Sequence, residues 1–183
     1  MPAADIKHDT TAFIQNRRAL YLPGSFFRIE LLMAHTERES VIVRFGHPEG
    51  ERLEFAFAGS ELERFQSSPD DWIRAAGTVA VGGFRGDSEL WFMSADFAGL
   101  LPELRELYET LRGDVDFKTT EDQVGFRLNG DGRGHIELRG HFLDRIGDGN
   151  RLDFTLNFDQ SLLRHSIAQI GDLVAAIGIG KGA

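Results

Sequence analysis

Hydrophobic and polar residues alternate most clearly in the last third of the chain. Apolar residues or glycine occupy every second position between 134 and 142 and again between 151 and 158. A period of two is typical of a β-strand that buries one face and exposes the other. Asp159 then precedes a run whose apolar residues recur at the spacing of one helical face as far as Ile177. The pattern predicts a β-hairpin and a helix over 159–177 that covers it.

Shorter segments of strand-like composition or alternation occur along the rest of the chain. The strands that they predict are, in chain order, 25–34, 41–45, 52–58, 78–84, 88–93, 115–120 and 123–129. Turns are expected where glycine and polar residues cluster between two such strands. We expect Arg85-Gly86-Asp87 to form one such turn, and 129–134 to form the turn before the last hairpin.

Two further helices are predicted between the strands. The first covers about 60–66, where Ser60 and Glu63 have the spacing of a capping box. The segment 70–76 is expected to add another helical turn. The second helix covers about 96–112, because its apolar residues form one stripe of a helical surface.

The pattern at 96–112 also contains signals for where the helix begins and ends. Gly113 is placed to end it, because glycine readily adopts the conformation that follows a helix. Pro102 lies inside the pattern. We therefore expect either a regular helix that begins near Pro102 or a kink at that residue.

Together these elements predict an α+β fold. Its mainly antiparallel β-sheet has about eight to nine strands, and the helices packed on it cover about 96–112, 159–177 and 60–66. A chain of 183 residues suits one domain with a substantial core. We expect three parts, namely a loosely ordered N-terminal arm over 1–24, a single α+β domain over 25–178 and a flexible tail over 179–183.

Composition narrows the environment and the partners. The N-terminus lacks the basic and then apolar pattern of a secretory signal, and no apolar run is long enough to span a membrane. We therefore expect a cytoplasmic protein with no membrane partner. The chain has no cysteine, which excludes disulfides and thiolate metal sites. No cofactor is predicted.

The charge of the chain argues against nucleic acid as a partner. The formal net charge is −9, whereas proteins that bind phosphate backbones are rich in Lys and Arg. The first 45 residues hold six basic and five acidic residues, so the acidic excess lies in the remainder. An acidic surface attracts basic partners, although it also simply keeps a protein in solution.

One strand face contains most of the candidate chemistry. His135, Glu137, Arg139 and His141 alternate with apolar residues and so share the polar face of strand 134–142. The two histidines lie about 20 Å apart along an extended strand, too far to bind one metal ion. The row is consistent with a solvated sheet face, with a binding surface, or with a catalytic pair completed by another strand. We predict no catalytic residue and no metal site.

Three short motifs resemble a known family. They are Gly132-Arg133-Gly134-His135-Ile136-Glu137-Leu138, Gly149-Asn150-Arg151-Leu152 and Phe158-Asp159-Gln160-Ser161-Leu162. Here the chain is similar to the WapI-type immunity proteins and to related bacterial domains, most strongly over residues 123–177. The resemblance implies a cytoplasmic, non-enzymatic α+β protein that binds and neutralises a toxin. It implies no catalytic residues.

Three functional hypotheses follow. The first is a non-enzymatic protein-binding domain, an immunity protein whose partner is a toxin domain, with Glu137, Arg139, His141 and Asp153 in the interface. The second is a small-molecule-binding protein or enzyme that uses the polar face of strand 134–142, which requires a concave pocket there. The third is a structural domain that assembles with itself through an exposed strand edge. The pattern leaves the oligomeric state open.

Overall fold

The computed structural model describes residues 40–67 and 72–178 of the protein. The first half contains β1 (Val41–Gly46), β2 (Arg52–Phe57), α2 (Gly59–Ser67), β3 (Trp72–Val81), β4 (Phe84–Met93) and α3 (Ser94–Thr110). The second half contains β5 (Arg112–Lys118), β6 (Val124–Asp131), β7 (His135–Leu143), β8 (Arg151–Asp159) and α4 (Gln160–Ala176). Each half is thus four strands followed by a long helix, with α2 inserted in the first.

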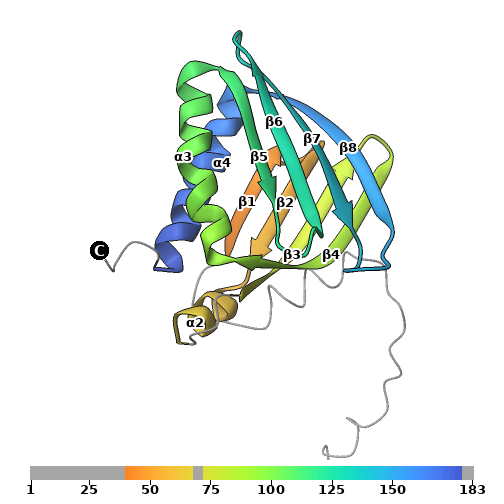
Figure 1. Ribbon diagram of the computed structural model, residues 1–183, viewed down its shortest axis with the longest axis vertical. Coiled ribbons are helices and arrows are strands. Elements are labelled where there is room, and N and C mark those ends of the chain that lie inside the picture. Colours follow the sequence, from red (N-terminus) through yellow and green to blue (C-terminus); the bar gives the residue numbers. More distant parts are fainter. Residues whose placement is uncertain (1–39, 68–71, 179–183) are drawn as a thin grey trace, which may run out of the picture.

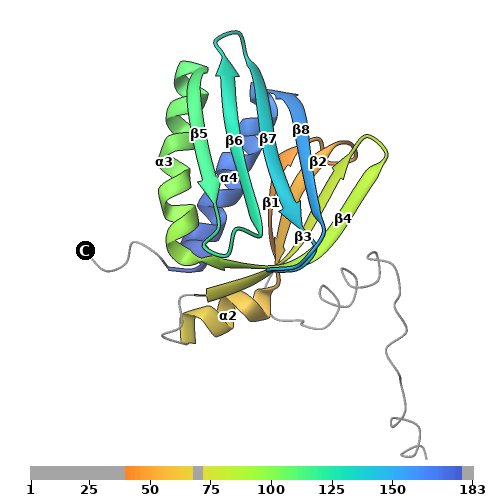
Figure 2. The same cartoon turned by 45° about the vertical axis from the view of Figure 1, so that its right-hand side comes forward.

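The eight strands form two antiparallel sheets that face one another. The first sheet has the order β1-β2-β3-β4 and the second has the order β5-β6-β7-β8. In Figure 1 the second sheet lies in front of the first, while α3 and α4 lie side by side along one flank. Figure 2 shows α2 apart from them, at the lower end of the first sheet. The α+β fold with its antiparallel strands and three helices is confirmed.

The core lies between the sheets, where the apolar positions of the alternating strands meet. Phe45 of the first sheet contacts Phe126 of the second, with ring centroids 4.9 Å apart. Phe92 of the first sheet contacts Phe97 of α3 at 5.0 Å, so the helix joins the same core. All four side chains are buried. These rings are part of a larger buried apolar core, whose removal from water stabilises the fold.

The hairpin in the middle of the chain turns earlier than predicted. Arg85, Gly86 and Asp87 lie inside β4, and the turn is formed by Gly82 and Gly83. Gly82 has a φ of +53°, a conformation that glycine adopts without strain in a two-residue hairpin turn. Gly86 is a packing residue instead, because a Cβ there would lie 3.2 Å from Val79 Cγ1.

The helical turn predicted over 70–76 is also wrong. Trp72 begins β3 and pairs with Met93 at the far end of β4. Ile73, the next residue of β3, is buried. Antiparallel pairing with a strand about 20 residues away overrides the local helical signal.

The two long helices lie where the sequence predicts them, and the residues at their ends explain where each begins and ends. The predicted cap Asp159 accepts a hydrogen bond from the Ser161 amide at 2.8 Å, which fixes the start of α4. Helix α3 begins at Ser94 and passes through Pro102, so it does not begin at the proline. Its last residue is Thr110, and Leu111 follows as the C-cap with a φ of +60°, the left-handed conformation that was expected of Gly113.

Some predictions lie outside the described residues. They are the strand at 25–34, the arm at 1–24 and the tail at 179–183. Among the residues that are described, no helix is long and apolar enough to cross a membrane.

Candidate protein-binding face on the second sheet

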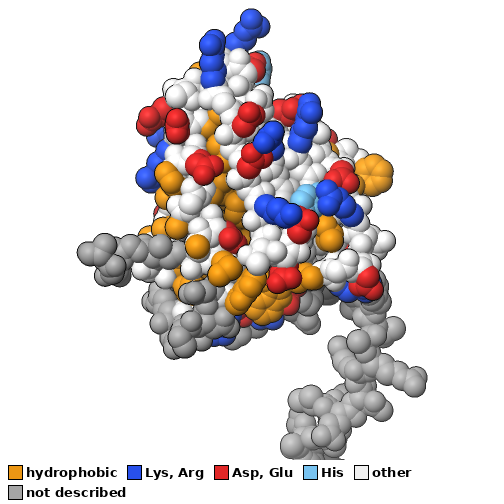
Figure 3. Space-filling model, viewed as in Figure 1, with side chains coloured by type: hydrophobic (Ala, Val, Ile, Leu, Met, Phe, Trp, Pro, Cys, Tyr) orange, Lys and Arg blue, Asp and Glu red, His pale blue; other side chains and the backbone are white. Residues whose placement is uncertain are grey.

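The outer face of the second sheet is a grid of polar side chains. Alternation along each strand turns the apolar residues inward, and the strand register aligns the others in rows across the sheet. These rows are Lys118-Gly125-His141-Asp153, Asp116-Arg127-Arg139-Thr155 and Asp114-Asn129-Glu137-Asn157. Figure 3 shows basic and acidic side chains intermingled over this side of the molecule.

Ion pairs orient the charged groups of this face. Arg127 Nε and Nη2 donate to the two carboxylate oxygens of Asp116 at 2.7 and 2.6 Å. This hydrogen bonding holds the pKa of Asp116 below its ordinary value. Arg139 pairs in the same way with Glu137, the two groups being 2.8 Å apart. Since these pairs are exposed, they contribute little to stability and mainly fix where the groups point.

A third pair completes the set on β8. Arg151 lies 2.8 Å from Asp153, and its hydrogen bond lowers the pKa of that carboxyl. Arg127 and Arg139 lie directly opposite one another on neighbouring strands, an arrangement that like charges usually avoid. The pairing carboxylates of β5 and β7 offset the repulsion between these two positive charges.

A shallow hollow of about 690 Å³ lies in the middle of the grid. Its polar lining comes from all four strands and includes Lys118, Arg127, Arg139, His141, Arg151, Asp153 and Thr155. Gly125 leaves room on the outer face, because a Cβ there would lie only 2.6 Å from Cε1 of His141. The ring of His141 occupies that space and forms part of the hollow.

His141 is held in place by the loop between β5 and β6. Its Nε2 lies 2.8 Å from Asp122 Oδ1 and 3.1 Å from the Asp122 carbonyl oxygen. Because both are acceptors, this nitrogen carries a proton in the contact. Burial of the Asp122 carboxylate opposes its ionisation, but Lys118 and His141 outweigh this and hold the pKa of Asp122 below its ordinary value. The histidine is only 14% exposed and is a fixed part of the surface.

The structure brings the four predicted interface residues together. Arg139, His141 and Asp153 line the hollow, and Glu137 stands in the next row as the partner of Arg139. Sequence reasoning missed Asp116, Lys118 and Arg127. Their alternation in β5 and β6 was visible, but only the strand order shows that these two strands share a face with β7.

The second hypothesis, a small-molecule-binding protein or enzyme, required a concave pocket on this face. The hollow provides one, but the described residues around it form no evident catalytic group. His135 pairs with Asp159 at the far end of β7 and does not line the hollow. No group of three or more His, Asp or Glu side chains within 40–67 and 72–178 is arranged to hold a metal ion. The arrangement is suited to multiple charge-assisted hydrogen bonds with a partner.

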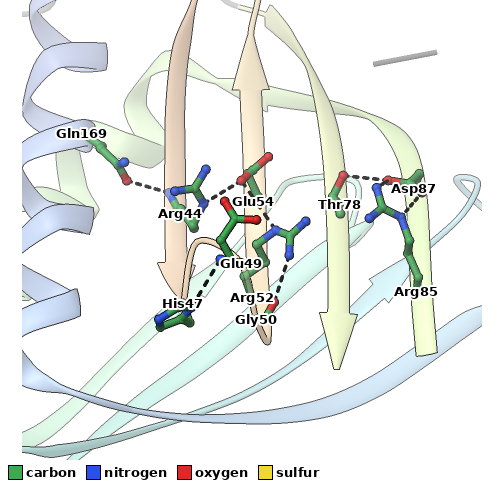
Figure 4. A network of polar contacts seen from close by, with 10 residues as sticks. All are labelled: Arg44, His47, Glu49, Gly50, Arg52, Glu54, Thr78, Arg85, Asp87 and Gln169. Carbon is green, nitrogen blue, oxygen red and sulfur yellow. Dashed lines mark hydrogen bonds and ion pairs between the residues drawn. The ribbon is translucent and has the colours of Figure 1, made fainter. Parts of the chain in front are cut away.

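The outer face of the first sheet is built differently (Figure 4). Glu54 is only 2% exposed there and lies 2.6 Å from Arg44 Nε and 3.7 Å from Arg52 Nε. Nearby, Thr78 donates to Asp87 at 2.7 Å. Glu54 and Thr78 are buried, and the charged groups that contact them are at most partly exposed. They therefore hold the sheet together and offer few free groups to a partner.

Comparison with known proteins gives a family match over most of the chain. Residues 44–178 match the family described as Immunity protein WapI-like family. Among curated proteins, none matches the chain.

Similar solved structures include the crystal structures of Trypanosoma bruciei MRP1/MRP2. The TM-score is 0.39 at 9% identity, with 85% of this chain and 97% of that chain covered. A guideRNA-binding protein complex bound to a gRNA gives a TM-score of 0.41 at 11% identity, with 78% and 94% covered. These scores are too low to bear on the fold or function of this chain.

Proposed function

The chain belongs to the WapI-like immunity protein family, and from that premise we propose that it is a non-enzymatic immunity protein that binds and neutralises a protein toxin. We further propose that the toxin binds the outer face of the second sheet, at the hollow and the rows of side chains around it. The single observation that favours this face is its set of exposed charged groups, oriented by their own ion pairs around an open concavity.

The charges of this face suggest what the toxin presents to it. Four basic side chains stand close to four acidic ones, namely Lys118, Arg127, Arg139 and Arg151 with Asp114, Asp116, Glu137 and Asp153. The face is therefore nearly balanced, although the whole chain has a net charge of −9. A toxin surface with both signs complements it better than a uniformly basic one. Complementary charges would then set the register and the rate of association.

The test is neutralisation in cells. Proteins that a tagged chain captures from the source organism would be expressed singly in a sensitive host, with and without the chain. We expect one toxic protein whose toxicity the chain abolishes and which co-purifies with it at equal stoichiometry. If the chain rescues no captured toxin and instead retains a small molecule in the hollow, the immunity proposal is wrong.

A further inference from the structure

The four edges of the two sheets are not protected equally. On β1, the Arg44 amide donates to Gln169 Oε1 at 2.9 Å (Figure 4). Ser166 of α4 donates to the Arg44 carbonyl. On β4, the Glu89 carbonyl accepts a hydrogen bond from Gln123 Nε2 at 2.7 Å. Helix α3 lies along β5 in both ribbon views. Proteins generally cover strand edges in such ways, because open edges pair with other chains.

Among residues 40–67 and 72–178, nothing protects the edge at β8 in this way. Two backbone hydrogen bonds lie at the two ends of the β7–β8 pairing, from Asp144 N to Asn150 O and from Gln160 N to Gly134 O. Both join even-numbered residues, and hydrogen-bonded pairs alternate with non-bonded pairs along antiparallel strands. Even-numbered residues of β8 therefore bond to β7, and the odd-numbered ones point their N–H and C=O groups outward. Within the described part of the chain, nothing bonds to the outward groups of residues 151–157, whereas the carbonyl of Asp159 also accepts the first bond of helix α4. The strand runs for nine residues in unbroken register and contains neither proline nor lysine.

The sequence of β8 is complementary to itself when two copies run antiparallel about Thr155. Arg151 then faces Asp159 of the second copy, and Asp153 faces Asn157 of the second copy. Each of these pairs occurs twice, because the arrangement is two-fold symmetric. Centring on Asp153 instead would place two like charges in contact. The residues of these pairs, like Thr155 itself, are odd-numbered, so the backbone groups that face the second copy are the ones that point outward.

We propose that β8 pairs with β8 of a second copy of this chain and that the two second sheets join into one eight-stranded sheet. Opposite charges and a hydrogen-bonding pair lie on the outer face, where Arg151 meets Asp159 and Asp153 meets Asn157. On the inner face, Leu152 meets Phe158 of the second copy, so apolar residues also face one another. The charge complementarity identifies a second copy as the occupant of this edge.

The pairing also enlarges the candidate binding face. Arg151, Asp153 and Thr155 of β8 line the hollow and border the free edge. Two hollows would therefore lie on the same side of one continuous sheet. The dimer does not depend on the toxin, so the two proposals can fail separately.

The test is sedimentation velocity over a wide range of protein concentration, with the full chain and three variants. The wild-type chain is expected to reach twice its monomer mass as concentration rises. Thr155→Pro removes the outward N–H at the centre of the pairing but no bond to β7, so the fold should persist. Two hydrogen bonds per dimer are lost, and dissociation should become easier by about thirtyfold. Thr155→Val keeps the N–H and should dimerise like the wild type.

A further disruptive variant and a second measurement distinguish loss of the dimer from loss of the fold. Arg151→Glu leaves the backbone unchanged but places a carboxylate opposite Asp159 of the second copy in each of the two symmetric pairs, so it should also weaken the dimer. In the wild type, hydrogen exchange at the odd-numbered amides of β8 should slow as concentration rises. The proposal is overturned if the wild-type chain is a monomer at every concentration. It is also overturned if neither Thr155→Pro nor Arg151→Glu weakens the dimer. Protection of these amides that requires a different protein would overturn it too.

Discussion

The two sheets share a strand order and antiparallel pairing, but their outer faces differ in how charge is arranged. On the first sheet, Glu54 is buried between Arg44 and Arg52. On the second, Glu137 and Arg139 pair at a similar distance, but Glu137 is about one third exposed and Arg139 is largely exposed. An ion pair out of water resists the loss of either member, whereas an exposed pair gains little from its own attraction. The same chemistry thus stabilises one sheet and leaves groups of the other available to a partner.

Removing one carboxylate from each face is the strongest test of that difference. Glu54→Ala leaves two largely buried guanidinium groups without this carboxylate and should lower the free energy of unfolding by about 3 kcal/mol. Glu137→Ala removes the partner of the exposed Arg139 and should change the free energy of unfolding by no more than about 0.5 kcal/mol. Urea unfolding of the two variants measures both.

Glu54→Gln serves as the control for shape. It keeps an acceptor of the same size without the charge, so its stability should fall between those of the wild type and Glu54→Ala. Equal losses for Glu54→Ala and Glu137→Ala would show that the two faces do not differ as described.

Lowering the pH should have a smaller effect on the free energy of unfolding. Because Arg127 holds the pKa of Asp116 below its ordinary value, the unfolded chain takes up the proton first as pH falls. The contribution of Asp116 to stability is then present above its unfolded pKa, near 4, and is lost as pH falls through its lower folded pKa. Asp116→Asn should therefore show a slightly shallower loss of stability below that pH. Unfolding curves at several acidic pH values would reveal it, and an unchanged slope would contradict the assignment.

The sequence predicted the second sheet better than the first. The hairpin of β7 and β8, the cap Asp159 and the helix that follows are local features, each set by residues close together in the chain. In the first sheet, two neighbouring segments, Gly82-Gly83 and Arg85-Gly86-Asp87, are both suited to a turn. Only the pairing of Val81 with Phe84 decides in favour of Gly82 and Gly83.

The sequence predicted about half of the residues of the candidate site. Alternation placed Glu137, Arg139 and His141 on one polar face, and the same alternation in β8 added Asp153. Asp116, Lys118 and Arg127 join them only because β5 and β6 pair next to β7. Strand order depends on how the whole core packs, so it is not encoded in any single segment. The division of the strands into two sheets has the same origin.

One measurement tests the central claim that the second sheet provides the binding face. Arg139→Glu and Arg85→Glu reverse the charge of arginines that each pair with a carboxylate two residues away, one on each sheet. With the toxin that the chain neutralises, we expect Arg139→Glu to slow association about tenfold and Arg85→Glu to leave it unchanged. Both melting temperatures should stay within about 2 °C of the wild type. Equal slowing by the two variants, or slowing by Arg85→Glu alone, would contradict the account.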